Sequence, residues 1–243
     1  MPRPPAPQVK PVSSKGPSGA LIGGVVVLVV ALIGALVFWA ATRGGDTSAA
    51  GGSSNALPDG GGISVGPGTD AEVPQLHVYG DPQCPWCGVL ENSIGEGVDE
   101  LVSAGEVNLT VTLMSFLDGR IQGENSARAA NAAVCADEVG AFLPFYKGMY
   151  AAQPQEGGGW TDGELVAIGE QAGISGSDLE TFTGCVDERP HDDYVQAMQE
   201  RANRDGVSGT PRLFVNGTQI SDQEMQGLME DASTLDAVIA NHS

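Results

Sequence analysis

The sequence predicts an α/β domain that is interrupted by a block of helices and preceded by a single transmembrane helix. Three observations support this prediction. A short apolar strand runs directly into an amphipathic helix whose first turn carries two cysteines. Strand patterns return only after a long run of helical periodicity. An uncharged apolar stretch near the N-terminus is long enough to cross a membrane.

The charge of the chain is strongly acidic. Its 243 residues include 31 Asp and Glu against 11 Lys and Arg, a formal net charge of −20. All of the acidic residues lie after residue 43. Because such a surface repels phosphate backbones, we expect no nucleic-acid partner.

Residues 20–42 are predicted to be the membrane anchor. Residues 20–41 contain no charged side chain and span about 33 Å as a helix. A cleaved signal peptide is the alternative, but its apolar region is usually shorter, about 7–15 residues. Residues 1–19 are Pro-rich and expected to be disordered. Basic residues are more frequent before the span than after it, so the chain is expected in the cell membrane as a single-pass protein, with a cytosolic N-terminus and an extracytoplasmic C-terminal domain.

Residues 43–72 are rich in Gly and Ser and lack apolar periodicity. This composition predicts a flexible linker with a root-mean-square span of about 30 Å. The folded domain is therefore expected to occupy residues 73–243.

The predicted elements of that domain follow in order along the chain. Residues 75–80 are a strand, and apolar residues at helical spacing then continue from Pro85 to near Gly105. Residues 107–117 alternate as a second strand, and helical patterns fill the region from about 119 to 206. A capping box at Thr161 and Glu164 opens one of these helices.

The last part of the chain predicts a return to the sheet. The sequence RLFV is a strand, Asn216-Gly217 is a tight hairpin turn, and TQI is the second hairpin strand. Ser221 and Glu224 form a capping box that opens one final amphipathic helix reaching Ile239.

The two cysteines of the sequence CPWC fall at the start of the first helix. Pro85 suits the first helical position, which makes Cys84 the N-cap and Cys87 the third helical residue. A thiolate on Cys84 would face free amide groups at the positive end of the helix dipole, so its pKa should fall. Cys84 is therefore the expected nucleophile, and Cys87, one turn inward, the expected resolving cysteine.

Two other uses of this cysteine pair are less consistent with the sequence. A zinc site needs four ligands, and none of the three histidines His77, His191 and His242 recurs at ligand spacing. A purely structural disulfide between Cys84 and Cys87 would contribute little stability, because it closes a very short loop. We therefore expect redox chemistry, with no metal and no cofactor.

The chain resembles a known family, the DsbA-like branch of the thioredoxin superfamily. The resemblance rests on the strand–CPWC–helix segment, the helical insert, and the sequence SGTPRLFVNG at 208–217. It covers roughly residues 73 to 240. It implies a thioredoxin fold with a helical insertion at about 119–206, and an extracytoplasmic thiol:disulfide oxidoreductase of the membrane-anchored, actinobacterial type.

The resemblance also implies roles for the residues around the cysteines. Pro85 and Trp86 would support the site, and Thr210–Pro211 would form a cis peptide bond beside the cysteines. The backbone of Thr210 would pair with an extended substrate peptide. Two interpretations of Trp86 stay open: an apolar platform for unfolded substrates, or a shield over the sulfur atoms.

One position departs from the family pattern. Many relatives carry a buried acid six residues before the first cysteine, and this chain has Val78 there. Asp81 is nearby, but its simplest role is to form the turn at Asp81-Pro82. The route by which Cys87 exchanges its proton is therefore not evident from the sequence.

The two remaining cysteines, Cys135 and Cys185, are fifty residues apart. Outside the cell such a pair usually forms a disulfide, and some actinobacterial-type relatives are similar in having an extra pair. We expect a structural bond worth about 4 kcal/mol. Two unpaired buried cysteines are the alternative.

The predicted function is donation of the Cys84–Cys87 disulfide to reduced exported proteins during oxidative folding. The resemblance implies a membrane reoxidase of the DsbB or vitamin K epoxide reductase type as a further partner, and residues 20–42 imply contact with the lipid bilayer. Three alternatives remain: a disulfide reductase, an isomerase of the same fold, or a non-catalytic, membrane-tethered peptide-binding module.

Overall fold

The structure, a computed structural model, describes residues 54–243. The predicted disordered segment 1–19, the predicted anchor 20–42 and the first part of the predicted linker lie outside the described residues. Within residues 54–243, none of the helices combines the length and the apolar character needed to cross a membrane.

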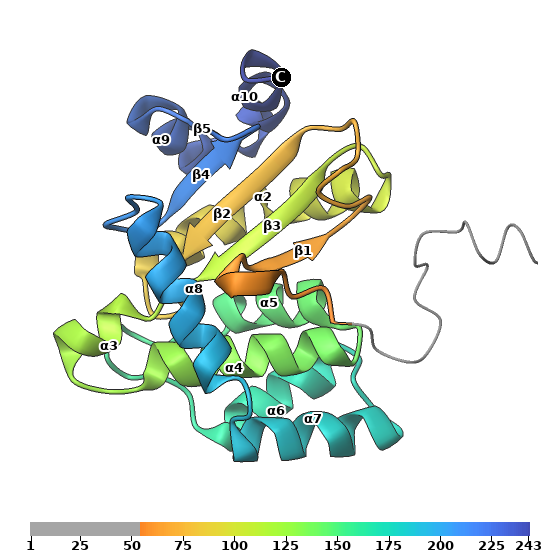
Figure 1. Cartoon of the computed structure of the whole chain (residues 1–243), viewed down its shortest axis with the longest axis vertical. Coiled ribbons are helices and arrows are strands. Elements are labelled where there is room, and N and C mark those ends of the chain that lie inside the picture. The colour runs from red at the N-terminus through yellow and green to blue at the C-terminus, as the bar shows by residue number, and fades with distance from the viewer. Residues whose placement is uncertain (1–53) are drawn as a thin grey trace, which may run out of the picture. The chain divides into compact units, whose positions relative to one another are not determined.

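A five-stranded mixed sheet forms the centre of the domain (Figure 1). Its strands follow the spatial order β1-β3-β2-β4-β5. The two central strands, β2 and β3, are parallel, and all other neighbours are antiparallel. The strands are β1 (Ile63–Val65), β2 (Gln75–Gly80), β3 (Asn108–Leu113), β4 (Arg212–Val215) and β5 (Thr218–Gln219).

Helices connect and cover these strands. The helix α2 (Pro85–Ser103) joins the parallel strands β2 and β3 as a crossover. Six helices then separate β3 from β4: α3 (Phe116–Ile121), α4 (Asn125–Glu138), α5 (Phe142–Ala151), α6 (Asp162–Gln171), α7 (Gly176–Glu188) and α8 (Asp192–Arg204). The chain ends with α9 (Asp222–Glu230) and α10 (Leu235–Asn241); two short 3₁₀ turns are η1 (Pro58–Gly60) and η2 (Ala232–Thr234).

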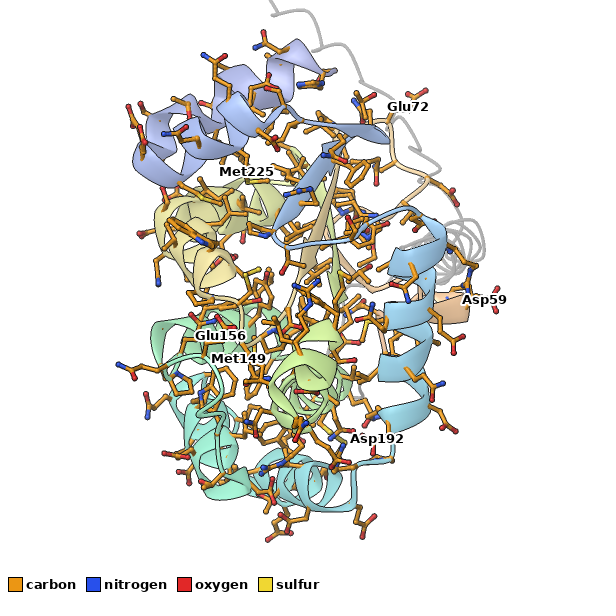
Figure 2. The ribbon with its side chains drawn as sticks, turned by 90° about the vertical axis from the view of Figure 1, so that its left-hand side faces the viewer. Asp59, Glu72, Met149, Glu156, Asp192 and Met225 are labelled. Atoms are coloured by element: carbon orange, nitrogen blue, oxygen red, sulfur yellow. A yellow bond between two sulfur atoms is a disulfide. The ribbon has the colours of Figure 1, made fainter. Side chains whose placement is uncertain are left out.

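The helical insertion lies at one end of the sheet, and α9 and α10 lie at the other (Figure 1). The core of the helical insertion is aromatic. Phe145 and Phe182 are fully buried and meet edge to face, with ring centroids 5.5 Å apart. Met149 points into the same interior, whereas Glu156 and Asp192 point outward into solvent (Figure 2). Burial of these large side chains therefore holds the insertion together as a layer of its own.

The two faces of the sheet carry different side chains. Val78 of β2 pairs in register with Val111 of β3, and both line the apolar space under α2. On the opposite face, Tyr79 donates a 2.8 Å hydrogen bond from its hydroxyl to Asp205, which caps the end of α8. All six residues of β3 are buried. Both faces of that central strand are thus covered.

The prediction that residues 43–72 form a flexible linker is wrong for its described part. Ile63–Val65 form the edge strand β1, and Ile63 is fully buried. Glycine permits this close approach, because a Cβ at Gly62 would lie 2.6 Å from the carbonyl oxygen of Val111. In the segment around β1, glycine therefore allows close packing of the backbone and does not indicate a flexible chain.

Two further predicted boundaries are corrected by the structure. The predicted strand 107–117 ends at Leu113, because Phe116 already begins α3. The single final helix is broken into α9 and α10 at Asp231, whose carboxylate accepts a 2.9 Å hydrogen bond from the amide of Ser233. A capping side chain thus starts a new turn where apolar spacing alone predicts continuity.

The other local signals are confirmed. Both predicted capping boxes are present, at Thr161–Glu164 and Ser221–Glu224. Asn216 and Gly217 both have positive φ angles, 50° and 77°, as a tight hairpin turn between β4 and β5 requires.

Candidate active site

Cys84 and Cys87 stand at the N-terminus of α2, directly after the end of β2. Cys84 is the N-cap and Pro85 the first helical residue, as the sequence predicts. The amide of Cys87 donates a 3.0 Å hydrogen bond to the carbonyl oxygen of Cys84, which closes the first turn. Cys84 and Cys87 are only 6% and 4% exposed, whereas Trp86 between them is 63% exposed. The motif therefore presents an indole to solvent above two shielded sulfur atoms.

The chain segment before β4 lies against the first cysteine. The Thr210–Pro211 peptide bond is cis, as expected from the resemblance. The Cys84 Sγ donates a hydrogen bond to the carbonyl oxygen of Thr210 at 3.4 Å. Within residues 54–243 the buried Thr210 hydroxyl has no hydrogen-bond partner other than the two thiols.

The two thiols differ strongly in acidity. The pKa of Cys84 is lowered to about 6, first by a hydrogen bond from the Cys87 thiol and then by the Thr210 side chain and the amides of Cys87 and Trp86. Burial raises the pKa of Cys87 well above its ordinary value. The helix amides were expected to be the main cause of this shift, but the neighbouring thiol contributes more. The asymmetry makes Cys84 the thiolate nucleophile at neutral pH.

The inner side of the site is formed by a glycine and two tyrosines. A Cβ at Gly80, the last residue of β2, would lie 3.0 Å from the hydroxyl of Tyr150 and 3.7 Å from Cys87 Sγ. It would also lie 3.9 Å from the hydroxyl of Tyr146. Both tyrosines come from α5, so the helical insertion supplies the polar groups that surround the buried sulfur.

Asp81, three residues before Cys84, is fully buried. Its carboxylate accepts hydrogen bonds from the amide of Gln83 at 3.0 Å, the amide of Leu117 at 3.1 Å and the hydroxyl of Ser126 at 2.6 Å. Burial raises its pKa to about 7, although these hydrogen bonds act in the opposite direction. Only the Gln83 contact forms the predicted turn, and the other two tie the active-site loop to α3 and α4.

A glutamine from the insertion holds the same loop from the other side. The Gln153 amide donates to the carbonyl oxygens of Pro82 and Cys84, at 2.7 and 3.0 Å. Gly88 makes room for it, because a Cβ there would lie 2.4 Å from the Gln153 Oε1 atom. The insertion therefore fixes the loop that carries Cys84.

Some site residues were not found from the sequence. Glu91, Tyr146 and Tyr150 were not singled out, although Glu91 lies four residues after Cys87 and thus on the same helix face. Val78 does lie beside Cys87, in the wall of one small cavity, at the position where the resemblance implies an acid. The tyrosines carried no sequence signal, because their approach depends on how α5 packs.

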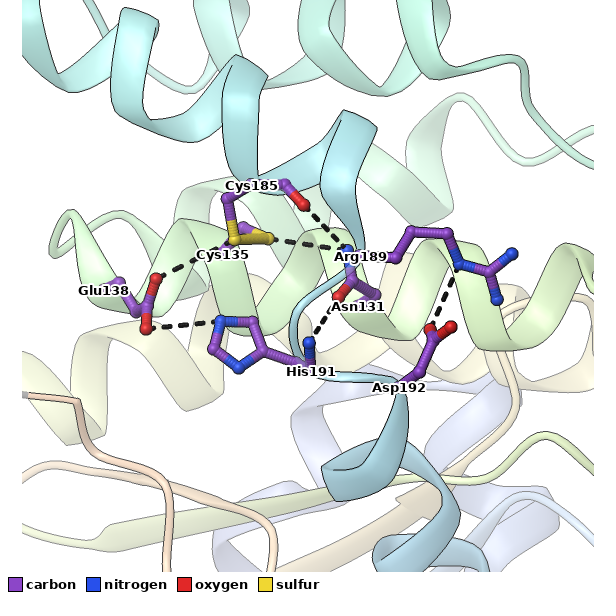
Figure 3. The surroundings of a disulfide bond; sticks show 7 residues. All are labelled: Asn131, Cys135, Glu138, Cys185, Arg189, His191 and Asp192. Carbon is purple, nitrogen blue, oxygen red and sulfur yellow. Dashed lines mark hydrogen bonds and ion pairs between the residues drawn. A yellow bond between two sulfur atoms is a disulfide. The ribbon is translucent and has the colours of Figure 1, made fainter.

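Cys135 and Cys185 form a disulfide bond that joins α4 to α7, with Cα atoms 5.8 Å apart (Figure 3). Asn131 supports the link, since its side-chain amide donates to the carbonyl oxygen of Cys185 at 3.3 Å. His191 is near both sulfur atoms. Because the two sulfurs are bonded to each other, they are not available as thiolate ligands for a metal.

Taken together, the strand order, the dithiol at a helix N-terminus and the cis proline beside it define a thioredoxin-fold protein with a redox-active site. The family model described as Thioredoxin matches residues 62–232. The chain therefore belongs to the thioredoxin family.

Part of a larger known protein is similar in sequence to this chain. Over 171 residues the chain is 30% identical to the serine/threonine-protein kinase PknE of Mycobacterium tuberculosis, covering 67% of this chain. It spans only 29% of the length of that kinase.

Two solved structures share the fold across most of the chain. DsbA from Mycobacterium tuberculosis, in its reduced form, has a TM-score of 0.54 at 26% identity, covering 79% of this chain and 97% of that one. The thiol-disulfide oxidoreductase MdbA from Actinomyces oris has a TM-score of 0.65 at 20% identity, covering 79% and 92%. These matches support a DsbA-like thiol:disulfide oxidoreductase as the class of enzyme.

Proposed function

We propose that the protein oxidises exported proteins by donating its Cys84–Cys87 disulfide to them during folding outside the cytosol. The observation that carries this proposal is the opposite shift of the two thiol pKa values, lowered to about 6 at Cys84 and raised at Cys87. A stabilised Cys84 thiolate favours the dithiol form of the enzyme. An enzyme whose dithiol form is the more stable one transfers its disulfide to substrate thiols.

The reaction proceeds through a mixed disulfide. A substrate thiolate attacks Cys84 Sγ, the Cys84–Cys87 bond breaks, and Cys87 leaves as a thiolate that takes up a proton. The second substrate thiolate then attacks the substrate sulfur of the mixed disulfide and releases Cys84 as a stabilised thiolate. Two electrons pass from the substrate to the enzyme, and one disulfide is transferred.

The geometry around Cys84 supports attack at this sulfur rather than at Cys87. Cys84 lies beside exposed Trp86 and the backbone of Thr210, at the side of the site where a substrate can approach. An extended peptide can pair with the backbone at Thr210 as an added strand, with apolar side chains on Trp86. Cys87, in contrast, faces the buried tyrosines.

The proposed location rests on the sequence. Residues 20–42 are apolar and uncharged up to Ala41, and the basic residues are concentrated before them. In a single-pass orientation with the N-terminus in the cytosol, the domain meets newly exported chains. The reduced enzyme then needs a two-electron oxidant, for which we propose a membrane reoxidase of the DsbB or vitamin K epoxide reductase type.

The experiment that tests this function mixes the oxidised protein with a reduced, unfolded protein and counts the remaining free thiols. We expect one substrate disulfide for each enzyme disulfide consumed, and complete loss of transfer in Cys84→Ser. Unchanged substrate thiols would instead indicate a peptide-binding module. Equilibration with glutathione separates the remaining possibilities, because a strongly reducing potential would indicate a disulfide reductase.

A protease-protection experiment on intact cells tests the location. We expect externally added protease to degrade the domain without lysis. A domain that is degraded only after lysis would place it on the cytosolic side and contradict the proposed location.

A further inference from the structure

Four side chains of the types that bind zinc meet around the Cys135–Cys185 disulfide, where α4, α7 and the start of α8 come together (Figure 3). One donor atom each from Cys135, Cys185 and His191 lies within 4.8 Å of the other two. Glu138 lies one turn after Cys135 on α4. Its carboxylate is 3.8 Å from Cys185 Sγ and 3.2 Å from His191 Nε2. Two sulfur atoms, an imidazole and a carboxylate are thus grouped at one point of the helical insertion.

The imidazole of His191 has a buried nitrogen atom that is not hydrogen bonded. Within residues 54–243 its Nε2 atom has no hydrogen-bond partner, although the Glu138 carboxylate is close to it. A buried polar atom that makes no hydrogen bond costs free energy. With its proton on Nδ1, the ring offers the lone pair of Nε2 to a metal ion. The side chain is therefore better satisfied by a metal beside the two sulfurs than by the protein groups around it.

Asn131 holds this group of side chains together. Its side-chain amide donates to Cys135 Sγ at 3.5 Å and to the carbonyl oxygen of Cys185 at 3.3 Å. Its side-chain oxygen accepts a 3.1 Å hydrogen bond from the backbone amide of His191. A hydrogen bond to a ligand atom and contacts that fix the ligand residues are what a metal site requires of its surroundings. These supporting contacts are already present in the disulfide form.

The dithiol form of the pair supplies a complete donor set for zinc. Two thiolates, one imidazole and one carboxylate suit a tetrahedral ion, with Zn–S bonds of about 2.3 Å and Zn–N or Zn–O bonds of about 2.0–2.2 Å. Donor atoms that share such an ion are about 3–4 Å apart, so the separations of up to 4.8 Å close with small side-chain movements. Cys135 is almost completely buried, whereas the Glu138 side chain is 38% exposed. An ion can therefore enter from solvent by way of the carboxylate.

We propose that the reduced Cys135–Cys185 pair binds one zinc ion, with Cys135, Cys185, His191 and Glu138 as its ligands. Two molecules of a small thiol first reduce the disulfide: the sulfur–sulfur bond breaks, the two thiols become a disulfide, and both cysteines are left as thiols. Binding of Zn²⁺ then releases the two thiol protons and transfers no electron. A disulfide oxidant that takes two electrons from the thiolates restores the Cys135–Cys185 bond and expels the ion. Zinc and the disulfide are thus alternative links between α4 and α7.

The test uses the chain with Cys84→Ser and Cys87→Ser, so that the CPWC dithiol does not bind the metal itself. One sample is reduced with a phosphine, which is removed under nitrogen, and a second sample stays oxidised. Both samples are titrated with Zn²⁺ in competition with a chromophoric chelator, which gives the number of bound ions and their affinity. Thermal unfolding is followed with and without the metal.

We expect one zinc ion per chain in the reduced sample and none in the oxidised sample. The affinity should fall at least tenfold in His191→Ala and in Glu138→Gln, because loss of an outer-shell partner alone costs about 10–100-fold. His242→Ala is the matched control, since its imidazole pairs with Glu224 outside this site, and the affinity should not change. Zinc should raise the midpoint of thermal unfolding in the reduced sample only, because it binds that folded form.

A reduced chain that binds no zinc would overturn the proposal, and so would an affinity that is unchanged in His191→Ala or in Glu138→Gln. Should a variant fail to fold, X-ray absorption at the zinc edge of the reduced parent sample decides. We expect two sulfur neighbours at about 2.3 Å and two nitrogen or oxygen neighbours at about 2.0–2.2 Å, with the outer-shell scattering of one imidazole. A zinc shell without an imidazole would overturn the proposal.

Discussion

The Sγ atom of Cys84 lies 3.4 Å from the carbonyl oxygen of Thr210, a residue 126 positions further along the chain. This contact joins the start of α2 to the segment before β4, which are brought together by the antiparallel pairing of β2 with β4. The nucleophile and the backbone expected to hold a substrate peptide thus lie together where β2 ends and β4 begins.

Replacing Thr210 with Val should raise the pKa of Cys84, because the hydroxyl is one of the groups that stabilise the thiolate. Each unit of increase would make the couple about 30 mV less oxidising. Titration of the ultraviolet thiolate absorbance and equilibration with glutathione measure the two quantities. Thr218→Val, at an exposed position of β5, is the matched control and should leave both unchanged.

Removing the second disulfide by Cys135→Ala with Cys185→Ala should lower the free energy of unfolding by about 4 kcal/mol, as expected for a fifty-residue loop. The pKa of Cys84 should not change, because the bond joins α4 to α7, away from the motif. Urea denaturation of the oxidised protein tests the first expectation. A loss of thiol exchange without a loss of stability would mean that this bond takes part in the reaction.

Asp81→Asn should destabilise the domain by about 1–3 kcal/mol at mildly acidic pH, because the amide of Leu117 then faces a side-chain NH₂ instead of an acceptor. The pKa of Asp81 is raised in the folded state, to about 7 from 3.8. Its contribution to stability is therefore complete below pH 3.8 and is lost as the pH rises through 7. Denaturation at several pH values should show the gap between parent and variant narrowing with rising pH, and a widening gap would refute the assignment.

Trp86→Ala distinguishes the two interpretations of the exposed indole. As a platform, Trp86 would be needed for the oxidation of an unfolded protein but not for exchange with glutathione. Since the side chain is 63% exposed, we expect this platform role and a change in stability within about 0.5 kcal/mol. Faster exchange with glutathione in the variant would show that the indole shields the sulfur atoms instead. Val89→Ala, a second exposed apolar residue, is the control.

The local elements were largely predictable, because their signals lie within a few residues of each other. The strand 75–80, the helix start at Pro85 and both capping boxes follow from periodicity and capping chemistry alone. The break at Asp231 was missed, since an internal capping residue competed with an unbroken apolar pattern. The strand β1 was missed because three residues among glycines carry almost no periodicity.

The active site was predictable in its motif but not in its surroundings. Only two residues separate Cys84 from Cys87, and their opposite pKa shifts follow from their positions in the first turn of the helix. The burial of Asp81 depends on Leu117 and Ser126, and these contacts arise only when the insertion packs on the loop. Composition and spacing do not reveal these tertiary contacts, so the sequence predicted only the turn-forming role of Asp81.

Titration of Cys84 in the reduced protein tests whether its sulfur is a thiolate at neutral pH, on which the proposed disulfide donation depends. We expect a midpoint of about 6, absent in Cys84→Ser and shifted upward in Cys87→Ala, because the Cys87 thiol is the strongest stabilising group. A midpoint of about 8.5, as in an unperturbed cysteine, would contradict it.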